Sequence, residues 1–226
     1  MMKGNKEHKR QWIQQVYKEL PQCVIATFLI SFGVTMFIGC ELGSDTVTVL
    51  LDGVNRSFHI PVSLVDQALS ILFFILAWVL NRKQLGMSSV INTLFLGICL
   101  ELSNLIFTPI ALAEQAMGIR IISIVFAQCC IAIGYAWLQT LSSGMGVIDA
   151  LLYGISYKTH IHYVVLHILF DALCITTGFA LHGVVGIGTI FSMLTMGAMI
   201  SMFQKSFLKL KDYRKIKLVK KRRKLL

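Results

Sequence analysis

Charged residues are scarce in this chain of 226 residues. Asp, Glu, Lys and Arg together make up 14% of the sequence, whereas soluble domains have roughly 25%. Acidic residues are the rarer kind, with 11 Asp and Glu against 21 Lys and Arg. The 6 cysteines form no Cys-x-x-Cys pair. We therefore exclude a soluble domain, a disordered chain and a small disulfide scaffold, and we expect no structural disulfide and no zinc site built on sulfur.

Apolar sequence takes the place of the missing charge. Hydrophobic residues make up 56% of the chain, yet its net charge is +10. Sixteen of the 21 Lys and Arg residues lie within the first 18 or the last 22 positions. Long apolar runs with isolated polar residues fill the region between these basic ends. This separation of charge from apolar sequence predicts a polytopic membrane protein.

Six apolar runs are long enough to cross the hydrocarbon core, which takes about 20 residues. Their approximate bounds are Gln22–Cys40, Val62–Leu80, Met87–Thr108, Ile119–Leu141, Tyr163–Leu181 and Val184–Phe203. If both ends are cytoplasmic, 19 Lys and Arg lie inside and 2 outside. This asymmetry predicts a multi-pass protein of the bacterial cytoplasmic membrane with both termini cytoplasmic. The basic tail directly follows an apolar run, so we expect it to meet anionic lipid rather than nucleic acid.

An internal repeat relates the two halves of the chain. A shift of 101 residues aligns several glycines and a His-Ile pair: Gly33 with Gly134, Gly43 with Gly144, Gly53 with Gly154, and His59-Ile60 with His160-Ile161. A shift of 100 aligns Gly86 with Gly186 and Gly97 with Gly197. Each half has three spans, an odd number, so the second half is inverted. The expected fold is all-α, with six transmembrane helices in two inverted three-helix repeats and a ligand site at the midplane between them. Chance similarity of apolar segments is the alternative.

Each repeat also has a short segment after its first span. Ser44–Phe58 and Val147–Thr159 are too short to cross the bilayer. Such a segment lies in the interface or enters the membrane as a half-helix, and Asp45, Asp52 and Arg56 favour the interface for the first one. We expect a basic cytoplasmic segment at 1–21, the first repeat at 22–115, the second at 116–204 and a basic cytoplasmic tail at 205–226.

A glycine-rich motif in the second repeat carries a family resemblance. Its residues are Gly144, Gly146, Asp149 and Gly154, followed by Gly186, Gly188 and Gly197. Over roughly residues 22 to 204 the chain resembles the YczE/YitT-type group of uncharacterised bacterial integral membrane proteins. The resemblance implies a permease-like protein without naming a substrate. The first repeat departs from the pattern, with Thr48 where Asp is expected and Asn55 where Ser is expected.

Ionisable residues inside spans are costly and are therefore functional candidates. The candidates for ligand binding or proton relay are His167, Asp171, His160, Asp66 and Glu101, together with the polar Asn92 and Ser192. His167 and Asp171 are four residues apart and share a helix face, which His160 joins if the helix begins there. They relay a proton or bind a cation, or they form a satisfied pair that holds two helices together.

The remaining polar residues have assignments of their own. Asn92 and Ser192 are repeat-related and are candidates to face the midplane together. Asp149 caps the second short helix or lines a vestibule. His59 and His160 are expected to end the two short helices.

The chain has no P-loop, no His-Glu-x-x-His and no Gly-x-Ser-x-Gly. We therefore expect no enzyme, no cofactor and no metal site. The leading interpretation is a small secondary transporter or permease-like protein for an unknown small molecule or ion. The alternative is a non-transporting membrane binding subunit or regulator that works with a partner complex. A homodimer and an assembly with partner subunits both stay open.

Overall fold

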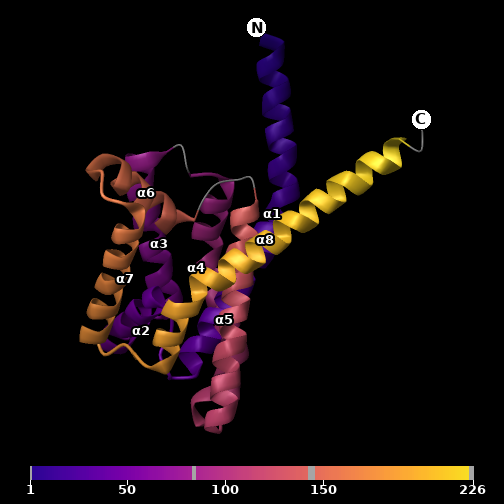
Figure 1. Cartoon of the computed structure of the whole chain (residues 1–226). Helices are drawn as coiled ribbons and strands as arrows, with labels where there is room; N and C mark the ends of the chain where they lie inside the picture. The colour runs from indigo at the N-terminus through magenta and orange to yellow at the C-terminus, as the bar shows by residue number, and fades with distance from the viewer. Residues whose placement is uncertain (1, 83–84, 142–145, 224–226) are drawn as a thin grey trace.

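The computed structural model describes residues 2–82, 85–141 and 146–223. In these ranges the chain forms eight α-helices and two short 3-10 helices, and it forms no strand (Figure 1). The α-helices are α1 (Met2–Gly39), α2 (Thr46–Phe58), α3 (Val62–Asn81), α4 (Met87–Phe107), α5 (Met117–Thr140), α6 (Val147–Thr159), α7 (Tyr163–Ala180) and α8 (Ile187–Arg223). The 3-10 helices η1 (Thr108–Ile110) and η2 (Leu112–Glu114) lie between α4 and α5. The all-α class is confirmed.

Six helical segments are long and apolar enough to cross a membrane. They are Glu19–Gly39, Val62–Asn81, Ser89–Glu114, Met117–Thr140, Tyr163–Ala180 and Ile187–Lys211. Each contains most of one apolar run identified in the sequence, so the six predicted spans are confirmed as candidate spans. Both ends of the chain lie at the same end of the bundle (Figure 1), as an even number of spans requires.

The centre of the molecule is the crossing of α1 and α5. Here Gly33 of α1 faces Ile131 of α5, and Gly134 of α5 faces Ile30 of α1. A Cβ atom on Gly33 would lie 2.6 Å from Ile131 Cγ1, and one on Gly134 would lie 2.5 Å from Ile30 Cγ1. Only glycine permits this approach, as at other close helix crossings in membranes. Around this pair α4 packs on α1, and α8 packs on α5.

The two short helices pack chiefly against α7 and α3 rather than against the spans that precede them in the chain. α2 packs on α7, and α6 packs on α3. A Cβ on Gly53 of α2 would lie 2.5 Å from the carbonyl oxygen of Gly178 in α7. A Cβ on Gly154 of α6 would lie 2.9 Å from Leu80 Cβ in α3. Gly53 and Gly154 therefore each bring a short helix close to a span.

α2 runs along the second half of α7. Its first residue, Thr46, donates from Oγ1 to Oδ1 of Asp171 (2.8 Å), at the middle of α7. Near its other end, Ser57 donates from Oγ to the carbonyl oxygen of Leu181 (2.7 Å), just after α7. α2 therefore begins level with the middle of a candidate span, deeper than its charged residues indicated from sequence.

Two histidines end the short helices. His59 and His160 have left-handed backbone conformations, with φ of 56° and 59°. Their N–H groups donate to the carbonyl oxygens of Asn55 and Ser156, each four residues earlier. This is the helix-ending role predicted for both. Because α7 begins only at Tyr163, His160 lies outside it and does not share the face of His167 and Asp171, which corrects one expectation.

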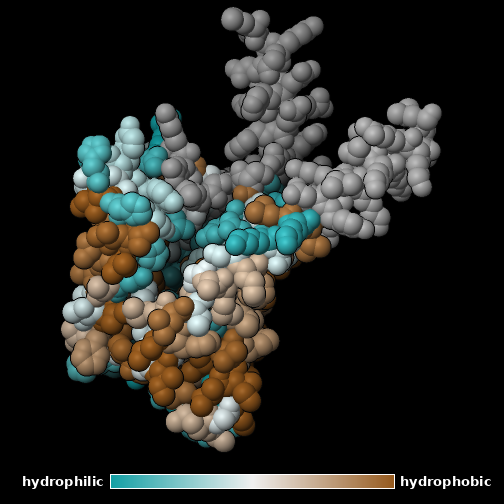
Figure 2. Space-filling model, viewed as in Figure 1, coloured by the Kyte–Doolittle hydropathy of each residue, from teal (hydrophilic) through white to brown (hydrophobic). Residues whose placement is uncertain are grey.

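The outer surface of the bundle is apolar. Only 11% of the α7 span is buried within the protein, and 17% of the α3 and α8 spans. The exposed side chains of α7 include Val164, Ile168, Leu169, Leu173 and Phe179. Figure 2 shows hydrophobic side chains over α7 and over the part of the bundle farthest from the termini. Such a surface exceeds what soluble monomers expose and fits contact with lipid.

Candidate functional site

Asp66 of α3 is a buried carboxylic acid. The residue is only 7% exposed. One carboxyl oxygen, Oδ2, has no hydrogen-bond partner among the described residues. The charge of Asp45, at the start of α2, acts on Asp66 and is of the same sign. An ionised carboxylate in such a place costs several kcal/mol. Asp66 is therefore the member of the predicted set least explained by packing.

Asp45 caps the amino end of α2. Its Oδ1 accepts the backbone N–H of Thr48 (3.1 Å), and its Oδ2 accepts the Thr48 hydroxyl (2.6 Å). Burial raises the pKa of Asp45, the two bonds from Thr48 oppose this rise, and the nearby charge of Asp171 adds to it. The sequence analysis did not name Asp45 as a site residue. Its signal was present as an Asp directly before a short apolar helix, which is a preferred helix-capping position.

His167 and Asp171 form the pair that their spacing predicted. Nδ1 of His167 lies 3.0 Å from Oδ2 of Asp171. The other oxygen of Asp171 accepts the Thr46 hydroxyl, so the carboxylate also joins α7 to α2. His167 and Asp66 are 101 residues apart in the chain. The shift that aligns the repeats thus places an imidazole in one repeat where the other has a carboxyl group.

Asp149 does not cap α6, which corrects the cap interpretation. The N-cap residue of α6 is Gly146, and Asp149 lies in the first turn. Oδ1 of Asp149 accepts the hydroxyl of Tyr163 at the start of α7 (2.7 Å). The ring of Tyr153 stacks on that of Tyr163, with centroids 4.2 Å apart. In α2, by contrast, the acid Asp45 is itself the N-cap residue, and Thr46 follows it.

Tyr135 of α5 relates these acids in space. The charges of Asp45, Asp66 and Asp149 all act on its hydroxyl. Tyr135 packs against the central core of α1 and α5. Tyr135, beside the α1–α5 crossing, is therefore near enough to all three acids for their charges to act on it. Sequence reasoning did not single out Tyr135, because a tyrosine in an apolar span gives no distinctive signal.

The repeat-related Asn92 and Ser192 have different surroundings. Oδ1 of Asn92 accepts the hydroxyl of Thr27, which joins α4 to α1 (3.1 Å). Ser192 of α8 is buried and 2% exposed. No hydrogen bond joins Asn92 and Ser192 in the described part of the chain, so their meeting at the midplane stays a prediction. Buried Gln128 of α5 also keeps its Oε1 without a partner among the described residues.

Most of the motif glycines have packing roles. Gly186 and Gly188 lie against Leu42 and Gly43, and the N–H of Gly188 donates to the carbonyl oxygen of Leu42 (2.9 Å). These contacts hold the start of α8 to the end of α1. Gly197 has open space where a Cβ would be. Gly144 lies outside the described residues.

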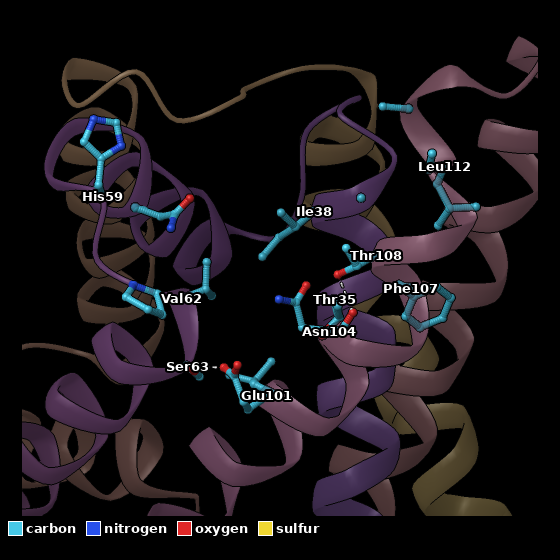
Figure 3. Close-up of a pocket in the computed structure, with 16 residues that line it drawn as sticks. Thr35, Ile38, His59, Val62, Ser63, Glu101, Asn104, Phe107, Thr108 and Leu112 are labelled. Atoms are coloured by element: carbon cyan, nitrogen blue, oxygen red, sulfur yellow. Dashed lines mark hydrogen bonds between the residues drawn. The ribbon is translucent and has the colours of Figure 1, made fainter.

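Glu101 lies apart from this acidic region, on a cavity of about 520 Å³ (Figure 3). The cavity lies between the end of α1, the turn from α2 to α3, the end of α4 and the two 3-10 helices. Oε2 of Glu101 accepts the hydroxyl of Ser63 in α3 (2.7 Å). His59 and Asn104 also line the space. The structure thus places the end of α2 and the end of α4 on one cavity, a proximity that sequence spacing did not indicate.

An ion-pair network closes the same end of the bundle. The guanidinium of Arg56 contacts Asp52 (2.9 Å) and Glu41 (3.1 Å). Oδ2 of Asp52 accepts the backbone N–H of Val184, between α7 and α8 (3.0 Å). Arg120 of α5 donates to the carbonyl oxygen of Cys40 (2.9 and 2.6 Å). These contacts hold α2 and the two repeats' connecting segments together.

Two comparisons with known proteins show what the chain is similar to. The model of a family of unknown function, DUF6198, matches residues 17–205, which include all six candidate spans except the last residues of α8's span. An uncharacterised protein of Haemophilus influenzae is 24% identical over 192 residues, covering 85% of each chain. No solved structure matches significantly. Neither match points to the YczE/YitT-type group by name, and both leave the substrate open. The matched region extends over nearly the whole helical bundle, and the chain belongs to the DUF6198 family.

Proposed function

We propose that this protein is a small secondary transporter of the bacterial cytoplasmic membrane. The proposed site lies beside the α1–α5 crossing, among Asp66, Asp45, Tyr135 and the His167–Asp171 pair. The solute and the coupling ion pass from one side of the membrane to the other around this region. The membrane character rests on the six apolar helices, and the transport role is our inference from the chemistry of the site.

The buried carboxyl oxygen of Asp66 is the observation that carries the proposal. It has no hydrogen-bond partner among the described residues, and the charge of Asp45 repels it. Burial of an unpaired charge is too costly for a purely structural residue, so the group holds a proton or meets a cation. Exchange of that proton or cation between two sides of a membrane is the elementary step of coupled transport.

The arrangement of helix contacts supports the inverted repeat that we propose. Several helix contacts occur in pairs related by exchange of the two halves: α1 on α4 resembles α5 on α8, and α2 on α7 resembles α6 on α3, whereas the contact of α3 with α4 has no comparable counterpart between α7 and α8. The glycine contacts of the α1–α5 crossing exchange in the same way. Two hydrogen bonds also repeat at a spacing of 101 residues, Asn55 to Ile60 and Ser156 to Ile161. Inverted repeats with a central site are a plan common to secondary transporters.

The start of α2 fits this plan as a half-helix end. It lies level with the middle of α7, as the bond from Thr46 to Asp171 requires. The amino end of a helix has partial positive charge and unpaired N–H groups. In transporters such ends point at ionic groups near the midplane. Here Asp45 occupies the end, with Asp171 beside it.

Solute-triggered charge movement in proteoliposomes tests the proposal. The purified full chain is reconstituted on a solid-supported membrane, and organic cations, amino acids, carboxylates and inorganic ions are applied with a pH gradient of either sign. We expect at least one class to evoke a transient current in the wild type. Asp66→Asn keeps the shape but not the ionisable group and is expected to reduce that current at least about tenfold.

Glu114→Gln is the matched control, because Glu114 is an exposed acid in η2 outside the acidic region. It is expected to keep the wild-type current. An undiminished current in Asp66→Asn, with equal protein incorporation, would contradict the assigned role of Asp66. A wild-type chain that responds to none of the solutes would contradict the transporter proposal itself.

A partner-dependent role is the second candidate, and the length of α8 favours it. The helix continues to Arg223, beyond its candidate span that ends at Lys211. This extension carries most of the basic tail. Native mass spectrometry of the protein released gently from its own membrane separates the two candidates. Stoichiometric foreign subunits support the binding subunit or regulator, whereas a monomer or homo-oligomer supports the transporter.

A further inference from the structure

We infer that the cavity beside Glu101 binds a small organic cation, such as a protonated or quaternary amine with an apolar substituent. Because this inference names a substrate class for the proposed transporter, it rests on the proposed function. The binding step itself requires no transport. Glu101 was a candidate of the sequence analysis, but neither comparison assigns it a role.

The size of the cavity fits a small molecule. Its volume of about 520 Å³ lies within the range of roughly 300–1,000 Å³ that is usual for small-molecule sites. It is bounded by four separate parts of the chain: the end of α1, the α2–α3 turn, the end of α4 and the 3-10 helices. A space closed by parts so distant in sequence is a property of the tertiary fold.

The charge on the cavity wall selects a cation. Glu101 contributes a carboxylate to the lining, and none of the lining residues is Lys or Arg. The hydroxyl of Ser63 bonds to one oxygen of this carboxylate. The two arginines at this end of the bundle are engaged elsewhere, Arg56 with Asp52 and Glu41, and Arg120 with the carbonyl oxygen of Cys40. No Lys or Arg of the wall therefore neutralises the negative charge of Glu101, and the basic side chain that the wall does contain is His59.

The remaining wall selects an organic rather than a hard inorganic cation. Val62, Leu100, Phe107 and Leu112 contribute apolar side chains to the lining, beside the polar Asn55, Asn104 and Thr108. Figure 3 shows Glu101 and Asn104 on α4 facing the turn that carries His59 and Val62 across the space. Calcium takes six to eight oxygen ligands, commonly from several carboxylates, and this lining has one. A single carboxylate in a partly apolar lining instead suits an ammonium group attached to an apolar body.

The location makes this an entrance rather than the central site. The cavity is lined by residues at the ends of α1 and α4 and by residues between α4 and α5, and the segment between α4 and α5 lies at the end of the bundle opposite the two termini (Figure 1). With cytoplasmic termini, it faces the outside of the cell. The second repeat has Ser201 where Glu101 stands in the first, at a shift of 100 residues. The acid is thus specific to one half and therefore to one side of the membrane.

Equilibrium binding to the full chain in lipid nanodiscs tests the inference. The probes are benzyltrimethylammonium, its neutral analogue benzyl alcohol and the anion benzoate, each with empty nanodiscs subtracted. We expect saturable binding of the cation and none of benzoate. Glu101→Gln preserves the size of the side chain and is expected to weaken cation binding at least about tenfold, which corresponds to about 1.4 kcal/mol.

The matched control is Glu114→Gln, which removes an acid from the neighbouring η2 but not from the cavity lining. It is expected to bind the cation within about twofold of the wild type. Absence of cation binding to the wild type, equal binding of benzoate, or unchanged binding in a Glu101→Gln protein with wild-type melting temperature would each overturn the inference. Because no gradient is applied, cation binding without any transport current would uphold this site and overturn only the proposed function.

Discussion

Single glycines decide how closely the helices of this protein approach. A Cβ atom on Gly33 would lie 2.6 Å from a side-chain carbon of Ile131 and 2.7 Å from the carbonyl oxygen of Ala127. Neither neighbour gives way easily, because one is backbone and the other belongs to a fully buried residue. Gly197 of α8 has nothing within 4 Å of the same point. Gly33 thus allows two helices to approach closely, whereas Gly197 makes no such contact.

Gly33→Ala is therefore expected to destabilise the protein by about 1–3 kcal/mol through overpacking. Gly197→Ala is the matched control, and it is expected to be neutral or slightly stabilising because alanine favours the helix. Thermal unfolding in one detergent, followed by intrinsic fluorescence, measures both. Equal melting temperatures for the two variants would show that the α1–α5 crossing is looser than described.

The acids of the site show what residue-level reasoning reached. Charge in an apolar span identified Asp66, His167 and Asp171, because a costly residue type stands out wherever it occurs. Asp45 and Tyr135 were missed, since an acid at a helix start and a tyrosine in a span are ordinary features. Their proximity to Asp66 follows from helix packing, which the order of residues along the chain does not state.

At the scale of the element, α2 is a short helix whose capped amino end lies beside the middle of α7. Its cap, Asp45, is buried enough that its pKa is raised above the ordinary value of about 4. An acid whose pKa is higher in the folded state stabilises the fold most at low pH, where both states are protonated. That stability is lost as the pH rises from about 4 through the folded-state pKa.

Asp45→Asn keeps a capping side chain but cannot ionise. The melting temperature of the variant relative to wild type is therefore expected to increase as the pH rises from about 4 towards 7. Other acids titrate in both proteins, so the difference between the two melting temperatures is the informative quantity. A difference that is constant over this range would mean that burial does not perturb Asp45.

The bounds of the two short helices followed closely from sequence, whereas α1 and α8 extend beyond the predicted spans Gln22–Cys40 and Val184–Phe203 into both basic ends. The segment Val147–Thr159 was predicted and found with the same limits, and the first short helix differs only at its start. Gly146 before the helix and His160 after it mark the two ends. Helix limits are readable because apolar period, caps and breakers are local properties. The depth of α2 was not readable, since it depends on bonds to α7, more than 120 residues away.

At the scale of the whole molecule, six candidate spans form a bundle with the α1–α5 crossing at its centre. The basic ends lie together at one end of the bundle, and the cavity of Glu101 lies at the other (Figure 1). Lys and Arg are concentrated at the terminal end, which is the cytoplasmic end under the positive-inside rule. This orientation is a prediction that reporter fusions test directly.

Green fluorescent protein fused after Leu226 is expected to fluoresce, because it folds in the cytoplasm. Alkaline phosphatase fused after Ala116, between α4 and α5, is expected to be active, because it folds only outside. The same enzyme fused after Arg82, between α3 and α4, is the inactive control. Activity at Arg82 and inactivity at Ala116 would mean that the protein lies in the membrane the other way up.

The sequence by itself determined the class, the number of spans, the positions of the short helices and the residues most costly to bury. These are consequences of composition, hydrophobic length and local spacing, which act along the chain. Tertiary structure alone decided that α2 pairs with α7, that Asp45 and Tyr135 join the acidic region, and that Glu101 faces a cavity. Each of these depends on contacts between segments far apart in sequence, and such contacts are selected by how the packed helices fit together.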